Sequence, residues 1–61
     1  MYQLTIIFEN QTVANEFVNG YSAAVKVAEE LSSRPNVFKV ALFAKDGNRV
    51  GVYMMGQFVR V

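Results

Sequence analysis

The chain has 61 residues, a hydrophobic fraction of 52%, no cysteine and no histidine. A domain of this size buries only about 60% of the surface that its unfolded chain exposes, so its core is marginal. Small proteins compensate with disulfides, a structural metal or oligomerisation, and the missing cysteine and histidine exclude the first two. The composition therefore predicts a single domain over residues 1–61 that self-associates, with a dimer favoured, and that holds no metal or cofactor.

Charge is unevenly distributed along the chain, although the net charge at pH 7 is only +1. Residues 1–33 carry one lysine against four glutamates, a net −3, whereas residues 34–61 carry five basic residues against Asp46, a net +4. The N-terminal apolar run, Leu4 to Phe8, has no basic region before it and is far shorter than a membrane span. We therefore expect a soluble, cytoplasmic protein with a basic C-terminal half.

The N-terminal segment predicts a β-hairpin. Apolar and polar residues alternate from Tyr2 to Glu9 with the period of two that is typical of a strand. If Asn10-Gln11 forms the turn, Phe8 lies opposite Val13, and Leu4 lies opposite Phe17. This agreement predicts a second strand over about 12–18.

One helix is predicted in the middle of the chain, from Ser22 as N-cap to about Arg34, where Pro35 ends it. Its apolar residues at helical spacing are Ala24, Val27, Ala28 and Leu31. A competing interpretation extends the helical stripe back through Val13, Phe17 and Tyr21. Gly20 near the middle of that stripe would cost about 1 kcal/mol relative to alanine, which favours the shorter helix.

The tetrapeptide Lys45-Asp46-Gly47-Asn48 predicts a C-terminal hairpin, because Asp-Gly between alternating apolar runs is a strong hairpin signal. A two-residue loop would place Phe43 opposite Val50. A three-residue loop over 46–48 would instead gather on one face Phe38, Val40, Leu42, Val50, Val52, Met54 and Phe58. The second register separates apolar from mixed residues better and is favoured, although one residue of slip exchanges the faces. Gly51 and Gly56 in the last strand indicate a bulge or a close backbone approach.

The elements together predict an α+β fold, a small ββαββ domain whose antiparallel sheet has one helix packed on one face. The expected core comes from both hairpins and the helix and comprises Leu4, Ile6, Phe8, Val13, Phe17, Ala24, Val27, Ala28, Leu31, Phe38, Val40, Leu42, Val52 and Met54.

Catalytic chemistry is not indicated. Histidine and cysteine, two usual sources of a base or nucleophile near neutral pH, are missing. The serines have no histidine partner, and Asp46-Gly47-Asn48 lacks the further ligands of a calcium loop. We therefore expect no enzyme, no catalytic residue and no metal site.

The outer face of the sheet is the predicted binding surface. In the favoured register this face shows Gln3, Thr5, Ile7, Ala14, Glu16 and Val18 on the first hairpin, and Lys39, Ala41, Phe43, Arg49, Tyr53, Met55 and Gln57 on the second. The predicted binding residues on this face, in the neighbouring turn and at the end of the chain are Lys39, Phe43, Lys45, Arg49, Tyr53, Met55 and Arg60.

Two functions fit this surface. Exposed apolar residues usually mark an association surface, so the first hypothesis is a small adaptor or inhibitor that self-associates through its sheet and binds another protein. The alternative is a nucleic-acid-binding module in which the basic hairpin contacts phosphates and Phe43 or Tyr53 stacks on bases. The sequence favours the first, because the net charge is nearly neutral and the final strands match no RNA-binding consensus.

Overall fold

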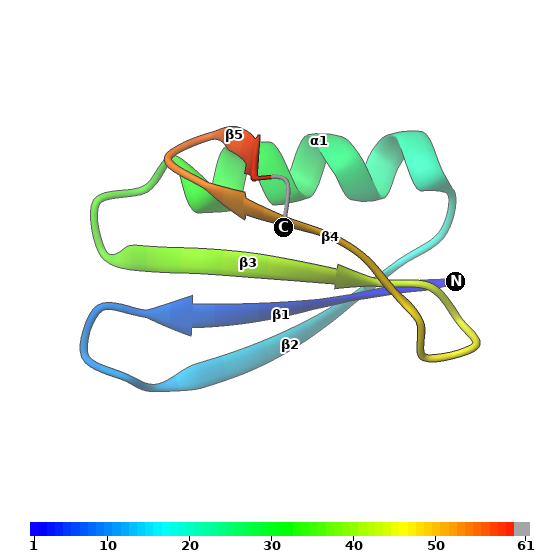
Figure 1. Ribbon diagram of the computed structural model, residues 1–61, viewed down its shortest axis with the longest axis horizontal. Helices are drawn as coiled ribbons and strands as arrows, with labels where there is room; N and C mark the ends of the chain where they lie inside the picture. Colours follow the sequence, from blue (N-terminus) through cyan, green and yellow to red (C-terminus); the bar gives the residue numbers. More distant parts are fainter. Residues whose placement is uncertain (60–61) are drawn as a thin grey trace.

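The fold is one five-stranded antiparallel sheet with a single helix, as predicted for an α+β ββαββ domain (Figure 1). The structure is a computed structural model that describes residues 1–59. Its elements are β1 (Tyr2–Phe8), β2 (Val13–Val18), α1 (Tyr21–Ser32), β3 (Val37–Phe43), β4 (Arg49–Met54) and β5 (Gln57–Val59). The strand order is β2-β1-β3-β4-β5, so β1 and β3 are central, and β2 forms one edge.

The first hairpin has a three-residue loop, and the predicted two-residue turn at Asn10-Gln11 is wrong. The Phe8 N–H donates to the Thr12 carbonyl, and Gln11 adopts a positive φ of 74°. This is the arrangement in which a turn is followed by a residue in the left-handed region. Gln3 therefore lies opposite Phe17, and the predicted pairing of Leu4 with Phe17 is off by one residue.

The helix packs through Ala24 and Ala28, which are fully buried, while Val27 and Leu31 are partly buried beside them. Its N-cap is Gly20, with a φ of 89° and no side-chain cap, so the predicted cap at Ser22 is wrong. Glycine adopts this positive φ without the steric cost of a side chain. The predicted end at Arg34 is two residues too late, and the longer helical interpretation is excluded because Val13–Val18 is a strand.

The β3–β4 hairpin has the predicted loop length but a different position and register. Its loop is 45–47, where Gly47 has a φ of 88° and the Ala44 N–H donates to the Asn48 carbonyl. A register shift between Leu42 and Phe43 then adds one residue to β4. Because a one-residue slip moves side chains to the other face, Tyr53 lies opposite Val40 and faces the helix.

The predicted last strand is divided in two by a tight turn at Met55-Gly56. Both residues have a positive φ, 54° for Met55 and 79° for Gly56, as a two-residue hairpin turn of type I′ requires. Gly51 is the predicted close approach, because the Phe58 ring of β5 occupies the space where a Cβ would lie. The Phe58 ring also meets the Tyr53 ring edge to face, with 5.5 Å between centroids.

The core lies between the helix and one face of the sheet. It is formed by eight buried residues, Leu4, Ile6, Ala24, Ala28, Val37, Val40, Leu42 and Tyr53. Three residues predicted for the core are exposed instead, namely Val13, Phe17 and Phe38. Val52 is buried but lies opposite Ala41 on the other face of the sheet, outside this cluster, and Met54 is only half-buried. No described helix is long and apolar enough to cross a membrane.

Candidate interaction surface

Among the described residues, no helix or strand covers the sheet face opposite α1 (Figure 1). Leu4, Ile6 and Val40 point toward the helix, so the residues that alternate with them point away from it. We call the sheet face that points away from the helix the open face. Its residues are Gln3, Thr5, Ile7, Val13, Asn15, Phe17, Lys39, Ala41, Phe43, Arg49, Val52, Met54, Gln57 and Val59.

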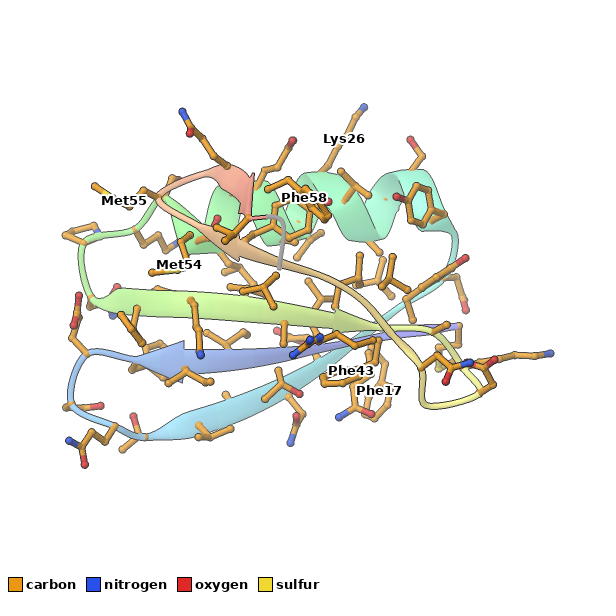
Figure 2. The ribbon with its side chains drawn as sticks, in the orientation of Figure 1. Phe17, Lys26, Phe43, Met54, Met55 and Phe58 are labelled. Carbon is orange, nitrogen blue, oxygen red and sulfur yellow. The ribbon has the colours of Figure 1, made fainter. Side chains whose placement is uncertain are left out.

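One row across the open face carries two phenylalanines and a cation. Phe17 and Phe43 both lie opposite Gln3, from β2 and β3, and Arg49 lies opposite Phe43 from β4 (Figure 2). Neighbouring strands are about 4.8 Å apart, which places the two phenylalanine Cα atoms about 10 Å from each other. Phe17 is 62% exposed, so this row presents an aromatic ring directly to solvent.

A hollow adjoins this row at the β3–β4 turn. It has a volume of about 200 Å³ and is lined by Met1, Gln3, Phe17, Ala44, Lys45 and Gly47. The Asp46 carboxylate at the tip of the turn accepts hydrogen bonds from the backbone and side-chain nitrogens of Asn48, at 3.0 and 2.9 Å. The turn is thereby held in shape beside the exposed Phe17 ring.

The other two rows combine polar hydrogen bonds with apolar side chains. The Asn15 Oδ1 accepts hydrogen bonds from Gln3 Nε2 at 3.1 Å and from Thr5 Oγ1 at 3.0 Å. Val13, Ile7 and Lys39 form the third row, in which Val13 is 58% exposed. Gln3, Thr5 and Asn15 thus hold one another in place on the open face.

The electrostatics of the open face are one-sided. Among the described residues it carries Lys39 and Arg49 and no carboxylate, while the neighbouring turn adds Lys45 and Asp46, one charge of each sign. The carboxylates of Glu29 and Glu30 lie on the helix instead, on the other side of the sheet. A surface with cations and no anions attracts a partner with negative charge.

The structure brings together three of the predicted binding residues, Lys39, Phe43 and Arg49, on the open face and places Lys45 beside them. Tyr53 does not join them, because the β4 register places it in the core with 4% exposure. Its burial raises the pKa of the hydroxyl, and Tyr21 and Glu29 raise it further. Met55 lies in the β4–β5 turn, and Arg60 is outside the described residues.

The most exposed apolar residues of the open face were predicted elsewhere. Val13 and Phe17 were assigned to the core, and the predicted outer-face residues Ala14, Glu16 and Val18 instead share the helix side of β2. The error is the single residue of slip in the first hairpin. Gln11 in the left-handed region causes it, and a glutamine gives no sequence signal for that conformation.

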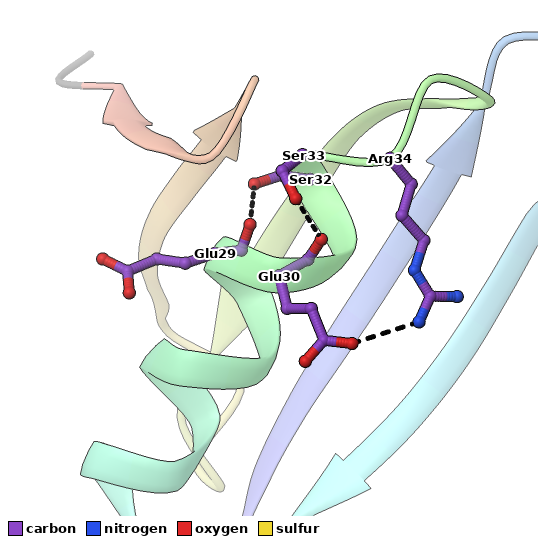
Figure 3. A network of polar contacts seen from close by, with 5 residues as sticks. All are labelled: Glu29, Glu30, Ser32, Ser33 and Arg34. Atoms are coloured by element: carbon purple, nitrogen blue, oxygen red, sulfur yellow. Dashed lines mark hydrogen bonds and ion pairs between the residues drawn. The ribbon is translucent and has the colours of Figure 1, made fainter.

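A second cavity, of about 420 Å³, lies at the other end of the molecule, between the helix C-terminus and the β4–β5 turn. Its serines are engaged by the backbone (Figure 3): Ser32 Oγ donates to the Glu29 carbonyl, and Ser33 Oγ donates to the Glu30 carbonyl. Arg34 pairs with the Glu30 carboxylate at 3.1 Å. These contacts complete the end of the helix, because both serine hydroxyls donate to backbone carbonyls of its last turn.

In the described part of the chain, no group of three or more histidine, cysteine, aspartate or glutamate side chains is placed so that it could hold a metal ion. Comparison of the chain with family models, with curated proteins and with solved structures found no match.

Proposed function

We propose that this chain is a non-enzymatic cytoplasmic protein, of adaptor or inhibitor type, that self-associates through its sheet and binds another protein through the open face. The observation that supports it best is the exposure of Phe17 and Val13, at 62% and 58%, on a sheet face without a covering element. Val13 lies beside Ile7 on this face, whereas Phe17 is separated from Val13 by Asn15, and exposed apolar side chains on an uncovered sheet face are typical of an association surface.

The charge of the open face defines the partner surface that fits it. Lys39 and Arg49 on the open face require carboxylates across the interface, since unpaired cations are costly to desolvate. Phe17 and Phe43 require an apolar contact between those carboxylates. The proposed partner is therefore an acidic protein surface with an apolar centre.

Charge reversal tests the partner. We expect the double variant Lys39→Glu/Arg49→Glu to lose proteins that the wild-type chain captures from its own lysate, because the open face then repels acidic surfaces. The matched control is Lys26→Glu, which reverses one exposed lysine on the helix side (Figure 2). Equal capture by both variants would exclude the open face as the binding surface.

Light scattering across a dilution series tests the self-association. A dimer mass that falls toward the monomer on dilution supports it. A monomer at every concentration up to the millimolar range would contradict the self-association. The small core would then have to be stable without the contribution of a second copy.

Nucleic acid is the second candidate partner, and one observation favours it. The first row of the open face runs in the order Phe17, Gln3, Phe43 and Arg49, on a face without carboxylates. Such a platform could stack bases and contact phosphates. The test is a titration of fluorescent single-stranded RNA at several salt concentrations. Affinity that falls steeply with salt and is lost in Lys39→Glu/Arg49→Glu supports this candidate, whereas no binding or a flat salt dependence rejects it.

A further inference from the structure

The free edge of β2 is the least protected part of this sheet. Natural edge strands are guarded by lysine, proline, bulges or short length, because their unpaired backbone groups bind other strands. β2 spans six residues, pairs with β1 without a register shift, and contains no lysine, arginine or proline. The opposite edge strand, β5, has only three described residues. Figure 1 shows β2 at the margin of the sheet that lies away from the helix.

The backbone groups at this edge can be identified from the ladder. The Phe8 N–H donates to the Thr12 carbonyl, so Thr12 and every second residue after it direct their backbone groups toward β1. The Glu9 N–H donates to the Asn36 carbonyl on the other side of β1, as this alternation requires. Val13, Asn15 and Phe17 therefore present their N–H and C=O groups at the free edge.

The same three residues have their side chains on the open face, and their order is self-complementary. When β2 is paired antiparallel with a copy of itself about a twofold axis at Asn15, Val13 lies opposite Phe17 of the copy. Asn15 then lies opposite Asn15. Each of these pairs is of the type that exchanges two hydrogen bonds, so the six free backbone groups of each copy all gain a hydrogen-bond partner. The two most exposed apolar side chains of the open face also meet across the seam.

Glu16, the one charged residue of β2, excludes one of the alternative registers. Residues that lie directly opposite each other in a sheet have their side chains on the same face. In a symmetric pair of β2 strands, one residue must therefore lie opposite its own copy at the twofold axis. An axis at Glu16 would place two carboxylates directly opposite, which destabilises a strand pair. With the axis at Asn15, Glu16 lies opposite Ala14 of the copy, and the two carboxylates are diagonal neighbours about 7 to 8 Å apart.

We propose that β2 pairs with β2 of a second copy about a twofold axis at Asn15, so that two five-stranded sheets become one continuous sheet. The proposal rests on the proposed self-association and names its surface and geometry. An axis perpendicular to the sheet keeps both open faces on the same side. The acidic partner would then meet a surface of twice the width, with Lys39 and Arg49 of each copy on either side of the seam.

A single cysteine tests this geometry in a chain that has none. Opposite Cα atoms in a hydrogen-bonded pair lie about 5.5 Å apart, within the range that a disulfide spans. We expect Asn15→Cys to form a disulfide-linked dimer nearly quantitatively under mild oxidation. The control Lys39→Cys lies on the same face but two strands from the edge, and it should stay largely uncrosslinked.

A charge at the axis provides the second test. Asn15→Lys places two lysines opposite each other and should weaken the dimer at least tenfold in light scattering, with an unchanged circular dichroism spectrum. Gln57→Lys adds the same charge at β5 and should leave the dimer intact. A wild-type dimer that ignores Asn15→Lys, or that crosslinks through Lys39→Cys instead, would overturn the edge pairing but leave the self-association standing. A wild-type monomer would overturn both.

Discussion

Met55 is the residue whose conformation fits its side chain least well. Its φ of 54° lies in the left-handed region, where a residue with a Cβ other than asparagine or aspartate is costly, and its side chain is 86% exposed. The exposed thioether has little packing to offset that cost. Gly56 beside it adopts a similar conformation freely, so the strain of the turn is concentrated at one position.

Replacing Met55 by asparagine should therefore stabilise the protein. We expect Met55→Asn to raise the free energy of unfolding by about 0.5 to 1 kcal/mol, because asparagine tolerates the left-handed region. Urea denaturation at one protein concentration measures it. The control Gln57→Asn changes an exposed residue in an extended strand and should give no gain. A loss of stability in Met55→Asn would mean that the methionine side chain makes contacts that outweigh its backbone strain.

At the scale of elements, the helix is joined to the far end of the sheet by one buried hydroxyl. Ser32 is 2% exposed, and its Oγ donates to the Glu29 carbonyl and accepts from the Gly56 N–H, both at 3.1 Å. This contact links the C-terminus of α1 to the β4–β5 turn. It also explains why a polar residue occupies a buried position of the helix.

Ser32→Ala should destabilise the protein by about 1 to 3 kcal/mol, because the Gly56 N–H is left in a part-buried position without its acceptor. Ser33→Ala is the matched control, since its hydroxyl donates only to the Glu30 carbonyl at an exposed position. That change should cost less than about 0.5 kcal/mol. Hydrogen exchange at the Gly56 amide should accelerate in Ser32→Ala alone. Equal effects of the two substitutions would show that the turn does not depend on this bond.

The elements themselves were predictable, whereas their registers were not. Alternation in β1, helical spacing around Ala24 and the Asp46-Gly47 turn specify type and order, because each reflects a local periodicity or backbone preference. Register depends on single residues: Gln11 in the left-handed region and the shift after Leu42. Each moves side chains from one face to the other, which is why Phe17 is on the open face and Tyr53 in the core.

At the scale of the whole molecule, the sheet separates two environments. The helix side holds the core and the carboxylates of Glu29 and Glu30, and the open face holds Lys39 and Arg49 with its apolar rows. The 12-residue helix has its main contacts with β1, β3, β4 and β5 and not with the edge strand β2. The uncovered face and the bare edge thus have one origin, since residues 1–59 form one helix with which to cover the sheet.

Such a molecule should draw part of its stability from its second copy, so its melting temperature should depend on concentration. Binding to the folded state stabilises it by mass action, and a tenfold rise in concentration contributes about 1.4 kcal/mol per dimer. With an unfolding entropy of about 2.1 cal/mol/K per residue over both copies, the melting temperature should rise by about 5 °C for each tenfold increase. Calorimetry over a hundredfold range would resolve this slope. Asn15→Lys should show a smaller rise over the same range, because its weakened dimer is less populated, whereas Gln57→Lys should keep the wild-type slope. A wild-type melting temperature independent of concentration would mean that the core of the single 61-residue chain keeps the protein folded without a second copy.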